Sequence, residues 1–154
     1  MEHTPVLRKD VQNYLSLSSK MTVVDATLGL GGHSKDILES VGESTKLIAF
    51  EQDERNLEEA RKRLKKYEKQ TEFVHDNFRN LKTRITELGI TEIDAILFDL
   101  GLSSPHVDEA ERGFSFMKEG PLDMRFDQRQ KLTASDVINS YSEDDLARIF
   151  KEYG

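Results

Sequence analysis

Short apolar runs alternate with helix-like segments from residue 22 to residue 98, and this alternation constrains the fold more than any other feature of the chain. The runs typical of strands are rich in β-branched and aliphatic residues and span 22–27, 46–50, 72–75 and 93–98. The segments between them show helical spacing of apolar residues over 33–40, 54–69 and 78–88. Strands joined by helices pair in parallel through right-handed crossovers. The pattern therefore predicts an open α/β sheet of Rossmann type with about four parallel strands, the last of them covered on both faces.

The segments on either side of this alternation have a different character. A short helix is expected after Pro5, with an apolar face formed by Val11, Tyr14 and Leu15. Residues 101–130 are rich in Gly, Ser, Pro, Arg and Asp and predict a long irregular stretch, which at this length is usually functional or disordered. Two further helices are expected to start at Thr133 and Ser142, because an acid follows each of them three residues on, as in a capping box. The second helix carries an apolar stripe formed by Leu146, Ile149, Phe150 and Tyr153.

The first strand ends in a glycine-rich turn, Asp25-Ala-Thr-Leu-Gly-Leu-Gly-Gly-His-Ser34. Its glycines at 29, 31 and 32 allow the backbone to approach a ligand closely at the N-terminus of the next helix. A dinucleotide-binding fingerprint would need Gly or Ala at position 34, where this chain has Ser34. The turn therefore fits S-adenosylmethionine better, since that ligand has no phosphate to cradle, and a plain tight turn between strand and helix is the alternative.

An acid follows at the distance expected for a ribose contact. Glu51 lies 22 residues after Gly29, at the end of the second strand, where a carboxylate can accept hydrogen bonds from both ribose hydroxyls. Asp53 is the competing candidate, and a surface acid without a ligand is the alternative. A carboxylate at this place would repel a 2′-phosphate, which disfavours an NADP-type ligand.

The fourth strand runs into Asp99-Leu-Gly-Leu-Ser-Ser-Pro105, and Asp99 is the third candidate site residue. The carboxyl ends of the first and fourth strands flank the crevice in which ligands bind in this fold. Asp99 can accept a hydrogen bond from a cofactor amine or from the amino group of a substrate base, and capping the next turn is the alternative. In the loop beyond, Arg112-Gly-Phe-Ser-Phe116 suits stacking on an unpaired base. Composition alone favours a different role, in which the aromatics pin the loop to the core and Arg112 pairs with Glu109 or Glu111.

Composition excludes several classes of protein. The chain has no cysteine and its four histidines lack ligand spacing, so no metal site is expected. No apolar run is long enough to cross a membrane and no signal peptide is visible, so a cytoplasmic location without a membrane partner is expected. The net charge of −7 argues against nucleic acid as a partner of the whole surface, although residues 55–84 hold ten Lys or Arg against five acids.

Six motifs that occur in order resemble the MraW family of bacterial S-adenosylmethionine-dependent enzymes, which methylate N4 of a cytidine in 16S rRNA. The motifs are His3-Thr-Pro-Val-Leu7, Asp25 to Ser34, Asn77-Phe78, Asp99 to Pro105, Arg112 to Phe116 and Pro121-Leu-Asp-Met-Arg125. The resemblance spans essentially the whole chain. It implies a methyltransferase that uses S-adenosyl-L-methionine as its cofactor and acts on 16S rRNA in the small ribosomal subunit.

The resemblance also implies site residues. Cofactor contacts are expected at Gly31, Gly32, His33, Glu51, Phe78, Asp99 and His106. Phe78 would pack near the adenine, and Asp99 would also act as the catalytic acceptor for the substrate amine. Glu51 stands where the family often has Asp, which keeps the carboxylate, whereas His106 stands where Gln is usual, which leaves the contact of that amide without a counterpart.

Family members continue beyond the position of Gly154 through a helical insertion and further core strands. Residues 1–127 are therefore expected to form the N-terminal part of the methyltransferase core and residues 128–154 the start of the insertion, with the chain a fragment or a shortened relative. A chain of this length is expected to be a poor catalyst or none. It is also expected either to be disordered after about residue 127 or to form a homodimer through its exposed last helix. The alternatives are a module that binds S-adenosylmethionine or RNA without turnover and a dinucleotide-dependent oxidoreductase, which Ser34 disfavours.

Overall fold

The computed structural model describes residues 5–154, so the predicted motif residue His3 lies outside the described part of the chain. The chain divides into two compact units, Met1–Gly101 and Leu102–Gly154. This division falls earlier than the predicted boundary at residue 127. The assignment of residues 128–154 to an insertion therefore stays a prediction.

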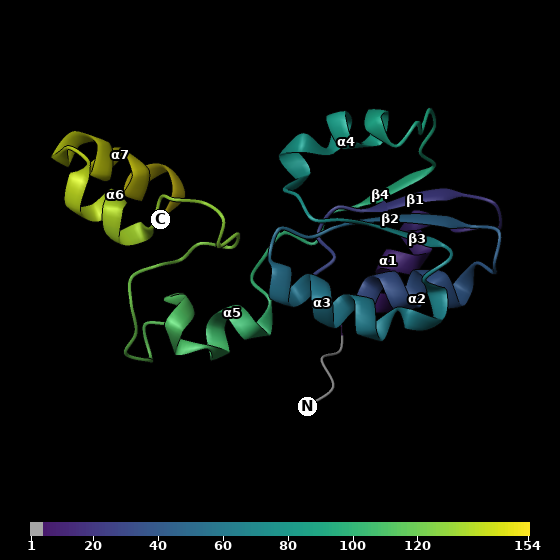
Figure 1. Ribbon diagram of the computed structural model, residues 1–154, viewed down its shortest axis with the longest axis horizontal. Coiled ribbons are helices and arrows are strands. Elements are labelled where there is room, and N and C mark those ends of the chain that lie inside the picture. Colours follow the sequence, from purple (N-terminus) through teal and green to yellow (C-terminus); the bar gives the residue numbers. More distant parts are fainter. Residues whose placement is uncertain (1–4) are drawn as a thin grey trace. The chain divides into compact units, whose positions relative to one another are not determined.

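The first unit is a parallel four-stranded sheet flanked by helices (Figure 1). Its strands lie in the order β3-β2-β1-β4. Their bounds are Thr22–Asp25 (β1), Lys46–Phe50 (β2), Thr71–Val74 (β3) and Ala95–Leu97 (β4). In the register of the central pairs, Val23 lies opposite Leu47 of β2 and Ala95 of β4. The predicted fold class is confirmed.

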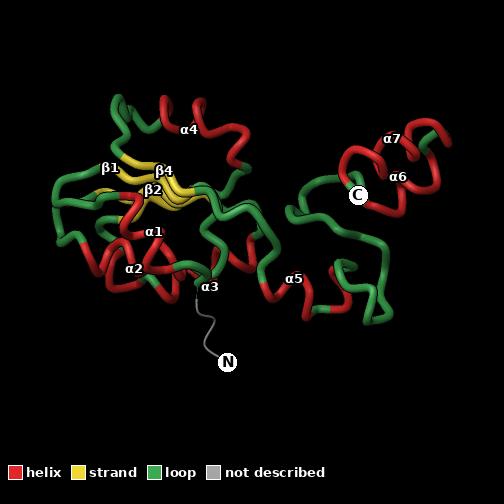
Figure 2. The backbone as a smooth tube through the Cα atoms, turned by 180° about the vertical axis from the view of Figure 1, so that it is seen from behind, coloured by secondary structure: helices red, strands yellow, loops and turns green. Residues whose placement is uncertain are grey.

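Helices cover both faces of this sheet, with α4 on one face and α1, α2 and α3 on the other (Figures 1 and 2). Their bounds are Arg8–Leu15 (α1), Gly32–Ser40 (α2), Glu54–Arg63 (α3) and Leu81–Glu87 (α4). Because side chains alternate along a strand, Val23 faces the core cluster that holds Ile37 and Leu57, and Val24 faces the cluster that holds Ile85. Ile37, Leu57 and Ile85, which the helical spacing predicted to face inward, therefore lie in the core.

Three expectations about this unit need correction. β4 has three residues and is not covered on both faces, since Ile96 is 41% exposed, and Phe98 just after it is 47% exposed. The helix expected over 54–69 ends at Arg63 and continues as a 3₁₀ turn, Lys65–Tyr67. Tyr14 does not belong to the packed face of α1, since its side chain is exposed.

The second unit contains four short helical elements joined by loops. They are α5 (Ser104–Asp108), the 3₁₀ helix η3 (Ala110–Arg112), α6 (Ala134–Ser140) and α7 (Glu143–Tyr153). The stretch expected to be irregular over 101–130 thus holds α5 and η3. The helix starts predicted at Thr133 and Ser142 are confirmed, because each hydroxyl accepts the backbone N–H three residues on.

The apolar stripe of α7 lies largely at the surface. Phe150 is 60% and Tyr153 79% exposed, whereas Leu146 and Ile149 are half-buried. Part of the apolar face of this helix is therefore open to solvent. Association of two chains through this face stays a prediction.

Candidate functional site

The candidate residues of the first unit gather at one end of the sheet, where the strands have their carboxyl ends. Parallel strands finish at the same end, so the glycine turn after β1, Glu51 after β2 and Asp99 after β4 come together there. Ligands of open α/β sheets bind at this end, next to the point where the strand order reverses. Here the chain moves from β1 outward to β3 and then returns to place β4 on the other side of β1.

The glycine turn needs glycine for two separate reasons. Gly29 and Gly31 have φ values of +52° and +77°, in the left-handed region that favours glycine. Gly31 also lies against α3, since a Cβ added there would be 3.3 Å from Cβ of Ala60 and 3.4 Å from Cδ1 of Leu64. The turn therefore packs directly on α3 and leads straight into the first turn of α2.

Glu51 is tied to this turn by its carboxylate. Oε2 accepts the backbone N–H of Gly29 at 2.8 Å, and Oε1 accepts the backbone N–H of Asp53 at 2.8 Å. Burial raises the pKa of Glu51 to about 7, against the lowering effect of these two amides. A carboxylate oxygen can accept more than one hydrogen bond, so both oxygens retain acceptor capacity for hydroxyl donors. The competing candidate, Asp53, caps α3 by accepting the N–H of Arg55 at 2.9 Å.

Asp25 and Ser34 form a buried hydrogen-bonded pair that the sequence did not predict. Ser34 Oγ donates to Asp25 Oδ2 at 2.7 Å, and the N–H of Thr27 donates to Asp25 Oδ1 at 3.1 Å. Burial raises the pKa of Asp25. Ser34, at the position of the third glycine of a dinucleotide fingerprint, thus fixes α2 to the end of β1. The signal in the sequence was a single acid closing an otherwise apolar strand.

Asp99 is joined to the turn after β1 from the other side. Its backbone N–H donates to Thr27 Oγ1 at 2.7 Å, which links the ends of β4 and β1. Its carboxylate is 54% exposed, and Oδ2 lies 3.7 Å from Nε2 of the buried His33. Asp99 thus combines a fixed backbone with a carboxylate that is open to a ligand.

Phe78 follows β3 on a turn with several hydrogen bonds. Asn77 Nδ2 donates to Gln52 Oε1 at 2.6 Å, which connects this turn to the residue after Glu51. Asp76 accepts hydrogen bonds from Arg84 and Asn80, and although burial opposes the effect, these bonds lower its pKa. The Phe78 ring, partly exposed, meets Phe98 edge to face with a centroid distance of 5.6 Å. The structure therefore brings Phe78 to the same end of the sheet as the glycine turn.

His106 lies in the second unit and is buried there. Its ring packs against Phe114 and Phe126 with centroid distances of 5.2 and 4.7 Å, and its Nδ1 lies 2.9 Å from Ser103 Oγ. The expected cofactor contact of His106 stays a prediction. In the same loop, Phe116 is exposed instead of pinned to the core, which corrects the role expected of it. Arg112 donates to the carbonyls of Arg125 and Phe126 in the interior, and its pairing with Glu109 or Glu111 stays a prediction.

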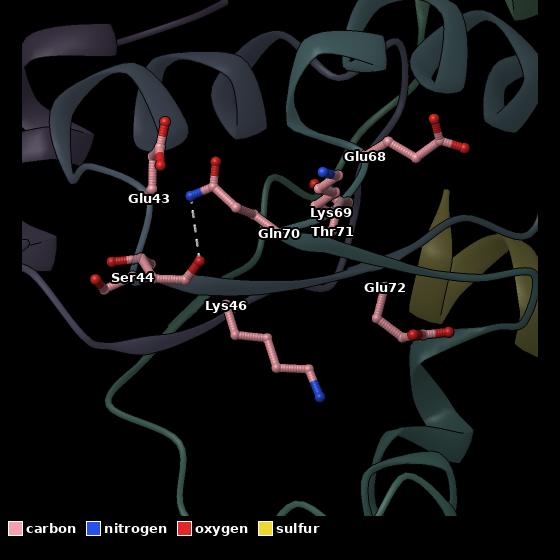
Figure 3. A pocket seen from close by; sticks show the side chains of 9 residues that line it. Glu43, Ser44, Lys46, Glu68, Lys69, Gln70, Thr71 and Glu72 are labelled. Atoms are coloured by element: carbon pink, nitrogen blue, oxygen red, sulfur yellow. Dashed lines mark hydrogen bonds between the residues drawn. The ribbon is translucent and has the colours of Figure 1, made fainter.

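A pocket of about 330 Å³ lies at the opposite end of the sheet, at the amino ends of β2 and β3 (Figure 3). Its lining is polar and carries both signs of charge, with side chains from 43–46 and 68–72. Within it Gln70 Nε2 donates to the carbonyl of Thr45 at 3.4 Å. None of the candidate site residues lines this pocket. The pocket is therefore separate from the candidate site at the carboxyl ends of the strands.

Among residues 5–154, no group of three or more His, Cys, Asp or Glu residues could hold a metal ion. In the same range, no helix has the length and apolar character needed to span a membrane.

Solved structures share the fold. An rRNA methylase from Streptococcus thermophilus is 28% identical, with a TM-score of 0.52 over 69% of this chain and 59% of that chain. A candidate rRNA methylase from Clostridium thermocellum is 22% identical, with a TM-score of 0.57 over 68% of this chain and 56% of that chain. NSun6 from Pyrococcus horikoshii, solved with SFG, is 20% identical, with a TM-score of 0.51 over 62% of this chain and 24% of that chain. The last two show likeness of fold alone.

Sequence comparison is more specific. The chain is 46% identical over all 154 residues to the ribosomal RNA small subunit methyltransferase H of Halothermothrix orenii. It covers 49% of that protein, so it spans about half the length of this curated relative. The MraW methylase family matches residues 1–154. On both grounds, the chain belongs to the MraW methylase family.

Proposed function

We propose that the chain binds S-adenosylmethionine at the end of the sheet formed by the glycine turn, Glu51 and Asp99. The observation that carries this proposal is the pair of hydrogen bonds from Gly29 and Asp53 to the Glu51 carboxylate, which fixes an acceptor beside the turn. The other side of the turn is held by Thr27 and Asp99. A site for an adenosyl ligand needs both a fixed acceptor for the ribose and a backbone that can approach closely.

The chemistry of these residues fits the cofactor. Glu51 would accept hydrogen bonds from the ribose hydroxyls, and Gly31 would allow close approach of the ligand. The partly exposed ring of Phe78 would pack on the adenine. Membership of a methylase family and likeness of fold to a protein solved with an S-adenosylmethionine analogue support this assignment.

We further propose that the reaction is methyl transfer to N4 of a cytidine in 16S rRNA. The cofactor supplies an electrophilic methyl group on a sulfonium. Asp99 would accept a hydrogen bond from the exocyclic amine and orient its lone pair, because positioning alone can lower much of the barrier. The target base would have to leave its stack to reach this end of the sheet. The name of the Halothermothrix orenii relative supports the small-subunit rRNA as substrate.

Calorimetry tests the cofactor proposal directly. We expect the wild-type chain to bind S-adenosylmethionine, and Glu51→Ala to weaken binding by about 1.5–3 kcal/mol, since a hydrogen bond to a charged group is lost. NADH and NADPH should not compete at concentrations that saturate the site with S-adenosylmethionine. Displacement by either nucleotide would favour a dinucleotide enzyme, and equal affinity of Glu51→Ala would remove Glu51 from the site.

Transfer of labelled methyl groups to small ribosomal subunits that lack the modification tests the reaction. A longer member of the family serves as the positive control. The control should incorporate label at N4 of a cytidine, whereas the 154-residue chain should transfer slowly or not at all, since it spans about half the length of its curated relative. Transfer by the chain at a rate comparable to the control would contradict this expectation, and labelling of another position would contradict the proposed reaction.

A further inference from the structure

The segment that leads into α1 contacts the first turn of α2, next to the glycine turn. Gly32 opens α2, and a Cβ added at Gly32 would lie 2.5 Å from Cγ and 3.3 Å from Cδ of Pro5. Gly32 is not among the glycines with positive φ, so its backbone conformation does not require glycine. The space that a side chain at position 32 would need is therefore filled by the Pro5 ring.

A second contact holds the same segment on α2. The Arg8 guanidinium donates to both carboxylate oxygens of Asp36, whose side chain is almost completely buried. One turn further along α1, Gln12 Nε2 donates to the carbonyl of Asp36 at 3.3 Å. A two-point bond between guanidinium and carboxylate fixes orientation as well as distance. Because α1 buries no residue completely, its placement depends strongly on contacts of this kind.

These two contacts flank the part of α2 that belongs to the proposed site. Pro5 touches the first residue of the helix, and Asp36 lies one turn later on the same helix. The first turn also contains His33, which lies near Asp99. Both helices lie on the same face of the sheet, as Figures 1 and 2 show.

We propose that Pro5 and Arg8 are positioning residues for the cofactor turn, and that Gly32 lacks a side chain to admit Pro5 and not the cofactor. The inference rests on the proposed cofactor site. The proline ring is fixed to its own backbone and cannot rotate away from a new methyl group. A side chain at position 32 therefore displaces the segment from the first turn of α2, and the orientation of that turn changes with it.

A double-mutant cycle on the dissociation constant for S-adenosylmethionine tests this proposal. Pro5→Ala removes Cγ and Cδ, the two atoms that a Cβ at position 32 would crowd, whereas Arg63 Nη1, at 3.6 Å, would be in ordinary van der Waals contact. We expect Gly32→Ala to weaken binding about tenfold in the wild-type background and less than about twofold in the Pro5→Ala background. The losses from the two substitutions would thus not add. If glycine is needed because the cofactor approaches it, the loss is equal in both backgrounds and the proposal is wrong.

The ion pair is tested with a neighbour on the same helix as control. Arg8→Ala should weaken binding several-fold, whereas Lys9→Ala, which truncates the exposed residue next to it, should leave binding unchanged. In the wild type, S-adenosylmethionine should also slow amide exchange over Arg8–Leu15, and this slowing should be lost in Arg8→Ala. An α1 whose exchange does not respond to the cofactor would contradict the positioning role, whatever the affinities.

Failure of the proposed function looks different from failure of this inference. A wild-type chain that does not bind S-adenosylmethionine overturns the proposed function and, with it, the cofactor role of this segment. In that case, the thermal unfolding midpoints of the four proteins in the cycle still test whether Pro5 fills the space beside Gly32. Gly32→Ala should lower the midpoint with Pro5 present and leave it unchanged in Pro5→Ala. An equal decrease in both backgrounds would show that Pro5 does not fill this space.

Discussion

A buried carboxylate that holds two backbone amides can also report on pH. Burial raises the pKa of Glu51 from an ordinary value near 4.5 to about 7, and ribose hydroxyls donate stronger hydrogen bonds to its ionised form than to its neutral form. We therefore expect affinity for S-adenosylmethionine to fall as the pH drops below 7, by up to about tenfold one unit below the pKa relative to the plateau above it. Calorimetry at a series of pH values measures this slope.

The same shift has a consequence for stability, with a definite sign. Because the pKa of Glu51 is higher in the folded chain, the folded state binds more protons than the unfolded state between about pH 4.5 and 7. This residue therefore contributes a free energy of unfolding that declines as the pH rises through that window. Glu51→Gln should flatten both the affinity profile and this decline, and an unchanged affinity profile in the variant would assign the pH dependence to another group.

The pair of Asp25 and Ser34 gives a second prediction for a single residue. Ser34→Ala removes a hydroxyl that stabilises the buried carboxylate, so the free energy of unfolding should fall by about 1–3 kcal/mol. The loss should grow as the pH rises, because the hydroxyl favours the ionised form of Asp25. Urea denaturation at a series of pH values measures this trend. Ser40→Ala, at an exposed position of the same helix, should change stability by less than about 0.5 kcal/mol.

At the scale of residues, the sequence predicts site residues best where the interval between two residues has a single structural explanation. The interval from Gly29 to Glu51 predicted an acid placed for a ribose contact, and in the structure this acid lies beside the turn and accepts a hydrogen bond from Gly29. The joint role of Asp25 and Ser34 could not be predicted in the same way. A serine at the third-glycine position argues against one ligand, but only coordinates show that its hydroxyl faces a buried acid. His106 is a similar case, because a motif position does not reveal that the ring packs among aromatics.

At the scale of elements, periodicity predicted the existence and order of the helices and strands, and it failed at their ends. The helix after Glu51 stops at Arg63 because the backbone tightens into a 3₁₀ turn, a change that leaves the apolar spacing almost intact. β4 was predicted as a covered strand from its apolar composition. Its position at the edge of the sheet leaves one side without a neighbour among the described strands, and composition carries no information on strand order.

The loop after α5 supplies a prediction for an element. Buried Arg112 donates to the carbonyls of Arg125 and Phe126, and the N–H of Met124 donates back to the carbonyl of Arg112 at 3.0 Å. Arg112→Ala should remove the first pair and increase amide exchange over residues 113–126, while exchange in β1 and β2 stays unchanged. Arg129→Ala, which truncates an exposed arginine after the loop, is the control. Exchange that rises equally in both variants would show that Arg112 does not hold the loop.

At the scale of the whole molecule, the two units differ in how much they bury. All fifteen buried apolar residues of the described part of the chain lie in the first unit. Among residues 102–154, all of which are described, His106 and Arg112 are the buried side chains. Apolar burial is the main source of folding free energy, so the two units should open at different free energies.

Native-state hydrogen exchange in low denaturant measures this difference. We expect amides of β1 and β2 to exchange at the free energy of global unfolding, and those of α6 and α7 to exchange at a clearly lower value. The well-protected central strands serve as the internal reference. Equal protection in both units would mean that the chain opens as one cooperative body, and the division at residue 101 would then have no energetic meaning.

The hydrogen bond from the backbone N–H of Asp99 to Thr27 Oγ1 joins residues 72 positions apart. We expect this separation to determine the order in which the parts of the site form during folding. Contacts between distant residues form late, because a long loop must close before they contribute any stability. The link between Gly29 and Glu51 spans 22 residues and can form while the rest of the chain is still being synthesised. The ribose side of the site is then assembled first. Asp99, and with it the side that would face the acceptor base, is added when the fourth strand arrives.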